Sequence, residues 1–440
     1  MPFDLNSIDT VVILMMENRS FDHMLGYLSL PAVARSEVDG LKDDYEWRLK
    51  YANAFNNKSY YPFRLSDPNK KLVGDPPHER KNIAVQLGQP NPTYPMNGFV
   101  ESFASFDPDA NLPLVMSHFE ADDLPSTDFF ARNFAIFNRW FSSLPAGTQP
   151  NRLMAMSGYS KIDVNADLTL PEQDLVYDWL TARGIRWRVY HDGIPFFAMM
   201  PRMIPTILEG DKFKSYSQFR VDIKGEDTAS FPQVIFIEPR YTDAPHIDPP
   251  ADDHAPSPMS NGQKFLKRVY TDLISNPDRW SKSVLIVTYD EHGGFFDHVP
   301  PDQTVKTSPP PGENYPRFES TGVRVPAFVI SPYVQPLTVV DGLHDHVSIL
   351  KFLAQKFDGG HYSPEVDARP TSNMLEVFSP VQRVEIPYPD EDPAVGYTQD
   401  RLPDGPLPSA FDKALHSMQE SDPEKTLQRF PDLVRGFTEP

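Results

Sequence analysis

The sequence predicts an α/β fold with a doubly wound, mainly parallel central sheet, helices on both faces and long loop insertions. Two short apolar runs, at residues 10–16 and 283–289, indicate central strands, because strands covered on both faces are continuously apolar. Between residues 175 and 274, patterns typical of strands alternate with patterns typical of helices. This alternation is typical of parallel sheets.

The first predicted strand, residues 10–16, is followed at once by the polar sequence ENRSFDH at residues 17–23. Residues 37–98 are rich in Asn, Pro, Tyr and Lys without a sustained period, which predicts a long insertion packed by its aromatic residues. These aromatic residues could instead box a choline head group through cation–π contacts, but such clusters usually hold their own loop together.

Apolar residues at helical spacing occupy residues 123–137, and the sequence PAGTQPNR follows at residues 145–152. A Gly-Thr step before a helix places the Thr148 hydroxyl near a helix N-terminus, where main-chain N–H groups favour a phosphate. Thr148 could equally cap that helix, and this segment alone favours the cap.

The rest of the chain continues the same alternation of strands and helices. In chain order we expect a helix at residues 175–184, strands at 186–190 and 234–237, an amphipathic helix at 262–274, a strand at 323–331 and a helix that begins beside His346. Proline and acidic residues dominate residues 379–408, which predicts an extended arm. We therefore expect a domain over residues 1–378 and a Pro-rich, acidic extension, residues 379–440, packed on or beside it.

Composition excludes several classes of function. Lys and Arg number 41 against 61 Asp and Glu, which gives a net charge of −20, and no basic run is present, so a nucleic-acid partner is not expected. The absence of cysteine excludes disulfides, thiolate metal sites and cysteine nucleophiles. We see no transmembrane segment or signal peptide and expect a cytoplasmic protein as written, or a secreted or periplasmic one if a leader was removed.

The second central strand leads into the sequence DEHGGFFDH at residues 290–298. Two adjacent carboxylates repel each other and burial would raise at least one pKa, so a bound cation is the simplest resolution; a solvated acidic turn is the alternative. The carboxyl ends of parallel strands meet at one edge of a sheet. The residues that can converge there are Glu17, Asn18, Thr148, Asp290 and Glu291.

Four segments, in this order, resemble the bacterial phospholipase C and acid phosphatase family: ENRSFDH at 17–23, GTQPNR at 147–152, DEHGGFFDHV at 290–299 and GVRVPAFVISP at 322–332. That family includes the plant non-specific phospholipases C, and its fold belongs to the alkaline phosphatase superfamily. The resemblance weakens after residue 379 and within two earlier stretches, 45–80 and 199–225. These are the parts expected to select the substrate.

The resemblance implies a metal site and a nucleophile. It places metal ligands at Glu17, Asn18, Asp290 and Glu291, and it makes Thr148 the nucleophile in contact with the cation. Ligands that are all oxygen favour one hard divalent ion, Ca²⁺, Mg²⁺ or Mn²⁺, while zinc or a second ion stays open. The expected course is in-line attack on phosphorus, a phospho-Thr148 intermediate and hydrolysis by water.

The resemblance also implies catalytic histidines. His254 and His346 each follow an aspartate in segments that resemble those carrying active-site histidines, and His78 matches a further position. His298, close to the two carboxylates in sequence, is a fourth candidate. Each has a structural alternative: His346 could cap a helix, His298 could be a satisfied core residue beside Asp297, and His78 could be exposed.

Three more residues are expected at the substrate. Asn151 and Arg152 follow the nucleophile closely enough to touch the phosphate, and Asp253 precedes a candidate histidine. Arg152 could instead pair with a carboxylate.

We expect a metal-dependent phosphoesterase, with phospholipase C-type cleavage of a phosphatidylcholine-like lipid as the first interpretation. The alternative is a broad-specificity acid phosphatase acting on phosphomonoesters. A non-catalytic phosphate- or metal-binding protein would be favoured by loss of the nucleophile or of a metal carboxylate, and all of these residues are present. The sequence does not indicate an oligomeric state.

Overall fold

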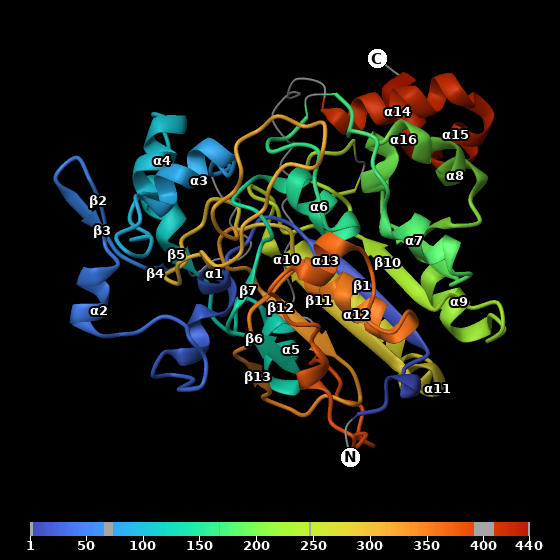
Figure 1. The fold of residues 1–440 in the computed structure, drawn as a ribbon, viewed down its shortest axis with the longest axis horizontal. Helices are drawn as coiled ribbons and strands as arrows, with labels where there is room; N and C mark the ends of the chain where they lie inside the picture. The colour runs from blue at the N-terminus through green and yellow to red at the C-terminus, as the bar shows by residue number, and fades with distance from the viewer. Residues whose placement is uncertain (1–2, 66–73, 167, 246–247, 391–408, 439–440) are drawn as a thin grey trace.

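The computed structural model describes residues 3–65, 74–166, 168–245, 248–390 and 409–438 of the chain (Figure 1). Residues 391–408 of the predicted arm therefore lie outside the described residues. The described part centres on an eight-stranded sheet of order β13-β6-β12-β11-β1-β10-β8-β9. Its strands are β1 (Thr10–Met16), β6 (Ala135–Phe137), β8 (Trp187–His191), β9 (Phe213–Ser215), β10 (Val234–Glu238), β11 (Ser283–Tyr289), β12 (Ala327–Ile330) and β13 (Val339–Val340).

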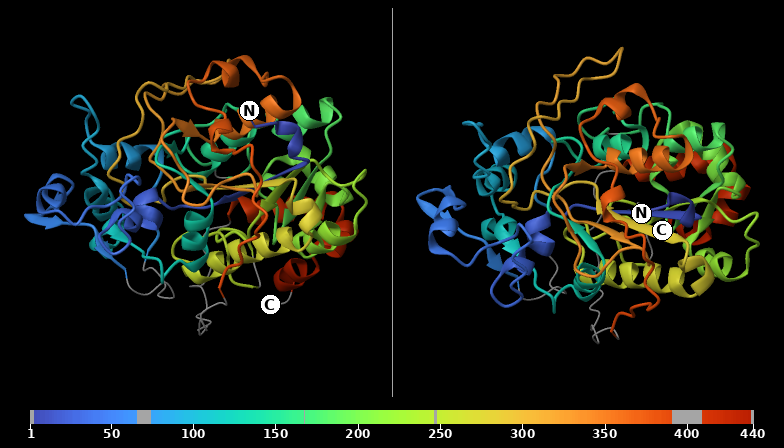
Figure 2. Two further views of the ribbon diagram at one scale, coloured as in Figure 1. Left: turned by 90° about the horizontal axis from the view of Figure 1, so that it is seen from below. Right: turned by 60° about the horizontal axis from the view of Figure 1, so that its bottom comes forward.

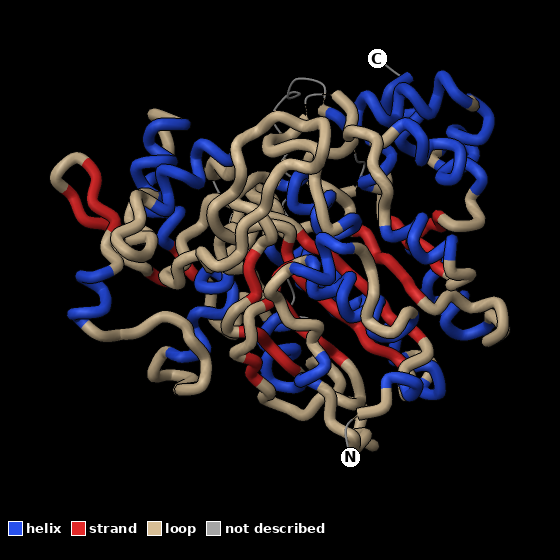
Figure 3. Tube along the Cα trace, in the orientation of Figure 1, coloured by secondary structure: helices blue, strands red, loops and turns tan. Residues whose placement is uncertain are grey.

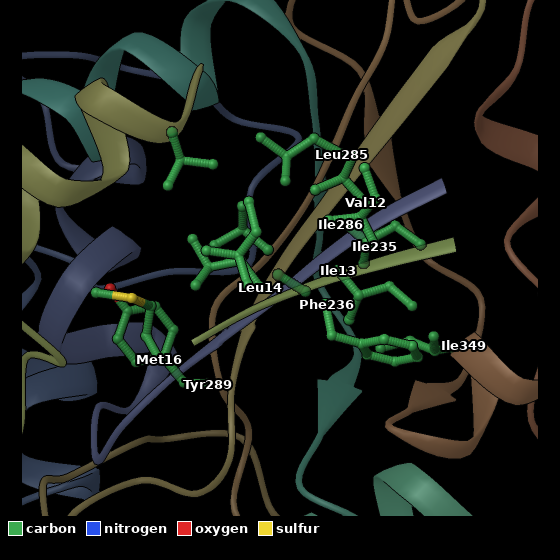
Figure 4. Packing of buried hydrophobic residues seen from close by; sticks show 14 of the residues in the cluster. Val12, Ile13, Leu14, Met16, Ile235, Phe236, Leu285, Ile286, Tyr289 and Ile349 are labelled. Carbon is green, nitrogen blue, oxygen red and sulfur yellow. The ribbon is translucent and has the colours of Figure 1, made fainter. Parts of the chain in front are cut away.

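Neighbouring strands of this sheet are parallel except at β12, which runs antiparallel to both β11 and β6. The predicted α/β fold with a mainly parallel sheet is therefore confirmed. The central strands β1 and β11 are buried along their whole length, which explains why both are continuously apolar. In the close-up of the core, Leu14 and Met16 lie on one face of the sheet, and Phe236 lies beside Ile349 on the other (Figure 4).

The register of the two central strands positions the site. Thr10 is paired with Ser283 and Met16 with Tyr289, so β1 and β11 end at the same level. Glu17 and Asp290 directly follow the two strands, so their backbones lie side by side. Around these strand ends the chain is mostly loop (Figure 3).

Helices cover both faces of the sheet. Helices α10 (Met259–Ile274) and α5 (Pro125–Asn133) pack together on one face, and α6 (Thr148–Ser157) and α12 (Val347–Phe357) pack on the other (Figure 2). The helical pattern predicted for residues 123–137 is only partly realised, because its last three residues form β6. Pairing of β6 with β12 and β13 satisfies its main chain in the sheet and outweighs the helical spacing.

Shorter elements complete the described chain. The other helices are α1 (Phe21–Leu25), α2 (Tyr45–Lys50), α3 (Arg80–Leu87), α4 (Phe99–Phe106), α7 (Val176–Ala182), α8 (Ile204–Glu209), α9 (Phe219–Gly225), α11 (Pro277–Trp280), α13 (Pro364–Ala368), α14 (Ala410–Ser421), α15 (Pro423–Arg429) and α16 (Pro431–Thr438). The short strands outside the main sheet are β2 (Asn53–Phe55), β3 (Lys58–Tyr60), β4 (Phe63–Arg64), β5 (Ser117–His118), β7 (Trp140–Phe141) and β14 (His344–Asp345). None of the helices in the described residues combines the length and apolar character needed to cross a bilayer.

The predicted insertion forms a satellite unit at one end of the molecule, where α2, α3 and α4 lie (Figure 1). Its apolar cluster includes Phe99 and Phe103 of α4 together with Phe295 and Phe296. The last two belong to the segment after β11, so the insertion is anchored on the candidate site loop. Trp47 packs against this cluster and against Tyr51, as expected for aromatic residues that hold the insertion together.

The C-terminal helices α14 and α15 pack on the main body. Phe411 and Met418 join the main apolar core, and the Phe411 ring stacks on Tyr241 with centroids 5.3 Å apart. The expected boundary between residues 378 and 379 stays a prediction.

Candidate active site

The site lies where β1 and β11 end, and a buried guanidinium joins the two strand ends. Arg152 of α6 approaches Glu17 Oε1 with Nη2 at 3.0 Å, and its Nε donates to Asp290 Oδ2 at 3.1 Å. Its Nη1 also donates to the Tyr241 hydroxyl at 3.1 Å. Of the two predicted roles for Arg152, the structure shows the pairing with carboxylates.

The loops that follow the two strands are in backbone contact. The N–H of Asn18 donates to Asp290 Oδ1 at 3.1 Å, and the N–H of Arg19 donates to the Glu291 carbonyl at 3.0 Å. A Cβ built on Gly293 would lie 2.1 Å from the carbonyl oxygen of Asn18, and Gly293 has a φ of +63°. Only glycine allows this approach without strain, so the Gly-Gly of the motif has a structural reason.

Thr148 is the first residue of α6, and the N-cap position belongs to Gly147. The predicted capping alternative for Thr148 is therefore not realised. Its hydroxyl is half-buried and donates to Asn18 Oδ1 at 3.5 Å. The N-terminus of α6 thus directs this hydroxyl toward the residues at the end of β1.

Glu291 provides a direct test of whether these residues suit a cation. Its Oε2 accepts from the Gly293 N–H at 2.8 Å, whereas its Oε1 is buried without a hydrogen-bond partner. Leaving a buried carboxylate oxygen unpaired is costly, and a metal ion would satisfy it. Glu17, Asp290 and Glu291 are all buried, only the first two pair with Arg152 among the described contacts, and all the predicted ligand atoms are oxygen, so the residues fit a hard divalent ion.

The pKa values of the site reflect burial and the pairing of its charged side chains. Burial raises the pKa of Asp290 to about 7, although Arg152 opposes the shift. Burial alone would also raise the pKa of Glu17, but Arg152 and His254 together hold it below its usual value. Burial lowers the pKa of Arg152, but Tyr241, Glu17 and Asp290 raise it by more. The pKa therefore lies above its usual value. The guanidinium therefore stays charged between its two partners.

Two of the four predicted histidines lie at this site. His254 Nδ1 is 3.1 Å from Glu17 Oε2, and its Nε2 is 3.4 Å from Asp75 Oδ2. His78 Nε2 lies 3.4 Å from Asn18 Nδ2, and the two imidazole rings are 5.7 Å apart. Burial lowers the pKa of His78, but the charges of Glu291 and Asp75 outweigh it and raise the pKa to about 9.

Acidic and histidine side chains in the described part of the chain come close enough to share an ion in three groups. They are Asp75 with His78 and His254, Glu17 with Asp252 and His254, and Asp22 with Asp297 and His298. The first two share His254 and adjoin the predicted ligands. The third shares no residue with the other two.

The other two predicted histidines take structural positions. His346 donates from Nε2 to the Asp290 carbonyl at 2.7 Å and accepts from Trp140 at Nδ1, while burial lowers its pKa to about 4. Both nitrogens are engaged, which leaves none for proton transfer to substrate. His298 is 2.7 Å from Asp22 Oδ2 through Nδ1 and 3.2 Å from Asp39 Oδ1 through Nε2, as in its core-residue alternative.

Asn151 and Asp253 also occupy supporting positions in place of the predicted substrate contact. Asn151 accepts from the Leu144 N–H, and its amide donates to the carbonyls of residues 144, 146 and 147, so it holds the turn before Thr148. Asp253 accepts from the Tyr289 hydroxyl at 2.6 Å and packs against Gly262 of α10. The preceding Asp252 is the aspartate that approaches Glu17.

Asp75, Asp252 and Gln86 are among the residues at the site that were not singled out from the sequence. Asp75 and Asp252 stand beside the predicted His78 and His254, so adjacency to these histidines was an available signal. Gln86, which contacts His292, lies in the insertion and carries no recognisable pattern.

The geometry agrees with the comparisons with known proteins. Residues 8–358 match the model of the Phosphoesterase family. The chain belongs to the Phosphoesterase family. Non-specific phospholipase C1 of Arabidopsis thaliana is 36% identical over 358 residues, which cover 76% of this chain and 62% of that protein. Phospholipase C B of Mycobacterium tuberculosis strain H37Rv is 28% identical over 419 residues, which cover 81% of this chain and 74% of that protein. The chain spans less than two thirds of the length of the plant relatives it matches.

Solved structures give only distant matches. A protein of the alkaline phosphatase superfamily from Vibrio parahaemolyticus is 12% identical, with a TM-score of 0.33, over 56% of this chain and 63% of that one. Murine ectonucleotide pyrophosphatase/phosphodiesterase 5 is 10% identical, with a TM-score of 0.35, over 58% and 95%. The fold class therefore rests on the strand order and direction of the sheet itself.

Proposed function

We propose that this Phosphoesterase family member is a divalent-metal-dependent hydrolase of phosphodiesters, with phospholipase C-type cleavage of a phosphatidylcholine-like lipid as its reaction. The observation that carries the proposal is the position of Thr148. Its hydroxyl stands at the N-terminus of α6, 3.5 Å from Asn18 Oδ1, at the end of a strand pair that supplies buried carboxylates. The phospholipase C names of the plant and mycobacterial relatives support a diester over a monoester substrate.

The ligands of a single ion would be Glu17, Asn18, Thr148, Asp290 and Glu291. When bound, Ca²⁺, Mg²⁺ or Mn²⁺ would favour the alkoxide of Thr148 and offset the charge of the phosphate. Arg152 keeps two of the carboxylates in place, because it contacts Glu17 and Asp290 at once. The dipole of α6 also favours negative charge at its first residue.

The reaction has two displacements at phosphorus. Thr148 Oγ1 gives up its proton to solvent and attacks phosphorus, and as the Oγ1–P bond forms, the bond from phosphorus to the glycerol oxygen breaks. We assign the proton for the departing oxygen to His78, because its pKa is raised to about 9 and its imidazole lies beside Asn18, the residue that accepts from Thr148. Water then attacks phosphorus from the opposite side and returns one proton to His78, the Oγ1–P bond breaks, phosphocholine leaves and Thr148 regains a proton from solvent.

His254 has a holding role in this scheme. It lies between Glu17 and Asp75, both within 3.4 Å, and so ties the end of β1 to the segment that carries His78. Burial opposes its protonation, but Asp75 and Asp243 raise its pKa well above the usual value. A protonated His254 can bond to both carboxylates at once.

The test is hydrolysis of p-nitrophenyl phosphorylcholine and p-nitrophenyl phosphate by EDTA-treated protein, before and after Mn²⁺ is restored. We expect metal-dependent turnover with preference for the choline diester. Thr148→Ala should abolish it, Thr148→Ser should keep part of it, and mass spectrometry of acid-quenched wild type should find phosphocholine on Thr148. Full turnover by Thr148→Ala would refute the covalent route, and preference for the monoester would make the protein a phosphatase.

A further inference from the structure

The amide of Gln86 joins two loops of the site that lie far apart in the sequence. Gln86 is on α3 of the insertion and is completely buried. Its Nε2 donates to the Pro77 carbonyl at 2.6 Å, and its Oε1 is 2.7 Å from His292 Nε2. Because an amide oxygen only accepts, His292 donates from Nε2 in this pair.

Each end of this bridge leads directly to a residue of the proposed mechanism. Pro77 precedes His78, and the neighbouring Pro76 carbonyl lies 2.8 Å from His78 Nδ1. On the other side, His292 Nδ1 is 3.1 Å from Glu291 Oε2. The Gly293 N–H donates to this oxygen of Glu291, and the His292 ring packs against it without a hydrogen bond, while the other oxygen, Oε1, is left buried without a partner.

The two loops approach each other too closely for side chains to separate them. A Cβ on Gly294 would lie 2.6 Å from Pro76 Cβ and 3.0 Å from the Pro77 carbonyl oxygen. A change in the Pro77 carbonyl is thus transmitted to the 290–298 segment by contact as well as through Gln86. The buried Gln86 amide is the polar link within this contact.

We propose that Gln86 is a positioning residue that sets Glu291 for metal binding and His78 for proton donation through one amide. The proposal rests on the proposed function for the role of His78, while the metal-binding half stands on the geometry of Glu291. Hydrogen-bonded partners of metal-binding carboxylates fix the orientation of the ligand, and their loss typically costs about 10–100-fold in metal affinity.

The first experiment compares Mn²⁺ binding to the EDTA-treated protein, residues 1–440, by calorimetry. Gln86→Met has a similar length but no amide, and we expect its Mn²⁺ affinity to fall about 10–100-fold. The matched control is Asn53→Leu. Asn53 is another fully buried amide of the insertion, which accepts from the Phe99 N–H and donates to the Met96 carbonyl without touching either site loop. It should lower the urea midpoint and leave Mn²⁺ affinity unchanged.

The second measurement uses the leaving group. Phosphocholine esters of p-nitrophenol, which leaves without a proton, and of a simple alcohol, which needs one, are compared at saturating Mn²⁺. Gln86→Met should lose more kcat on the alkyl ester than on the nitrophenyl ester, because His78 is displaced. Gln86→Glu keeps the acceptor for His292 but loses the donor to Pro77. It should keep most of the Mn²⁺ affinity and still show the leaving-group effect.

Several outcomes would overturn the inference. If Gln86→Met binds Mn²⁺ as tightly as the wild type, Gln86 does not position Glu291. If its kcat falls equally on both esters, Gln86 does not position His78. A matching affinity loss in Asn53→Leu would reduce the effect to general loosening of the insertion. If Gln86→Met does not fold, Gln86→Glu tests the His78 half through the leaving-group effect, and Gln86→Leu repeats the Mn²⁺ comparison for the Glu291 half. If the wild type hydrolyses neither ester, the proposed function fails, and the Mn²⁺ comparison still tests Gln86.

Discussion

Arg152→Met tests whether the guanidinium and a metal ion balance the same carboxylates. Arg152 is buried and approaches Glu17 Oε1 at 3.0 Å and Asp290 Oδ2 at 3.1 Å. Methionine occupies a comparable space without the charge. In the absence of metal, the variant leaves two buried carboxylates beside the unpaired Glu291 oxygen.

The expected loss follows from these contacts. At an effective dielectric constant near 20, opposite charges about 4 Å apart attract by about 4 kcal/mol, and Arg152 forms two such pairs. Burial already raises the pKa of Asp290 to about 7, so protonation of that carboxyl recovers part of the loss in the variant. We therefore expect the free energy of unfolding to fall by about 3–5 kcal/mol in EDTA, the range for breaking a buried ion pair.

The assay is urea unfolding of wild type and Arg152→Met in EDTA and in saturating Mn²⁺. The ion should stabilise the variant more than the wild type, because it restores positive charge to carboxylates that have lost their guanidinium. Arg324→Met is the matched control, since Arg324 is completely buried and pairs with Asp22 and Asp297 at 3.0 and 3.1 Å.

Arg324→Met should lose similar stability without extra stabilisation by Mn²⁺. If Mn²⁺ stabilises Arg324→Met more than Arg152→Met, the ion binds at Asp22, Asp297 and His298 instead. Equal stabilisation of wild type and Arg152→Met would refute the reasoning.

Three further predictions address the surroundings of the site. Gly293→Ala places a Cβ against the Asn18 carbonyl at a backbone φ of +63°. We expect a free energy of unfolding in urea that is lower by about 1–3 kcal/mol and weaker Mn²⁺ binding by calorimetry. An unchanged urea midpoint would contradict this. Burial opposes a charged His298, but Asp22 and Asp39 raise its pKa from 6.5 to about 9, so its contribution of up to about 3 kcal/mol is complete below pH 6.5 and is lost as pH rises through 9. In His298→Leu this decrease in stability with rising pH should be absent. Urea midpoints of both proteins across pH 6–10 measure the difference. His346→Gln should lower the free energy of unfolding by about 1 kcal/mol, because it weakens the hydrogen bonds to Asp290 and Trp140. Burial lowers the pKa of His346 to about 4, so the pH profile of kcat/KM above pH 6 should not change. A shifted profile would mean that His346 transfers a proton.

The sequence predicted the central strands because burial on both faces demands continuous apolar runs, and β1 and β11 begin and end where the pattern indicates. It also placed Glu17, Asn18, Asp290 and Glu291 at strand ends, since parallel strands bring their carboxyl ends to one edge. The pattern over residues 123–137 was less informative, because pairing with β12 and β13, which no local spacing reveals, converts its end into β6.

Only the tertiary structure decided which polar side chains meet. His254 and His346 have similar local sequences, each after an aspartate, yet one contacts Glu17 and the other bonds the main chain of Asp290. Gln86 reaches His292 across 206 positions of the chain. A residue type records what a side chain can donate or accept, while its partner is set by the packing of elements distant in sequence. The sequence by itself thus determined the central strands and the family and proposed a set of ligand residues, and the fold determined which side chains these residues contact.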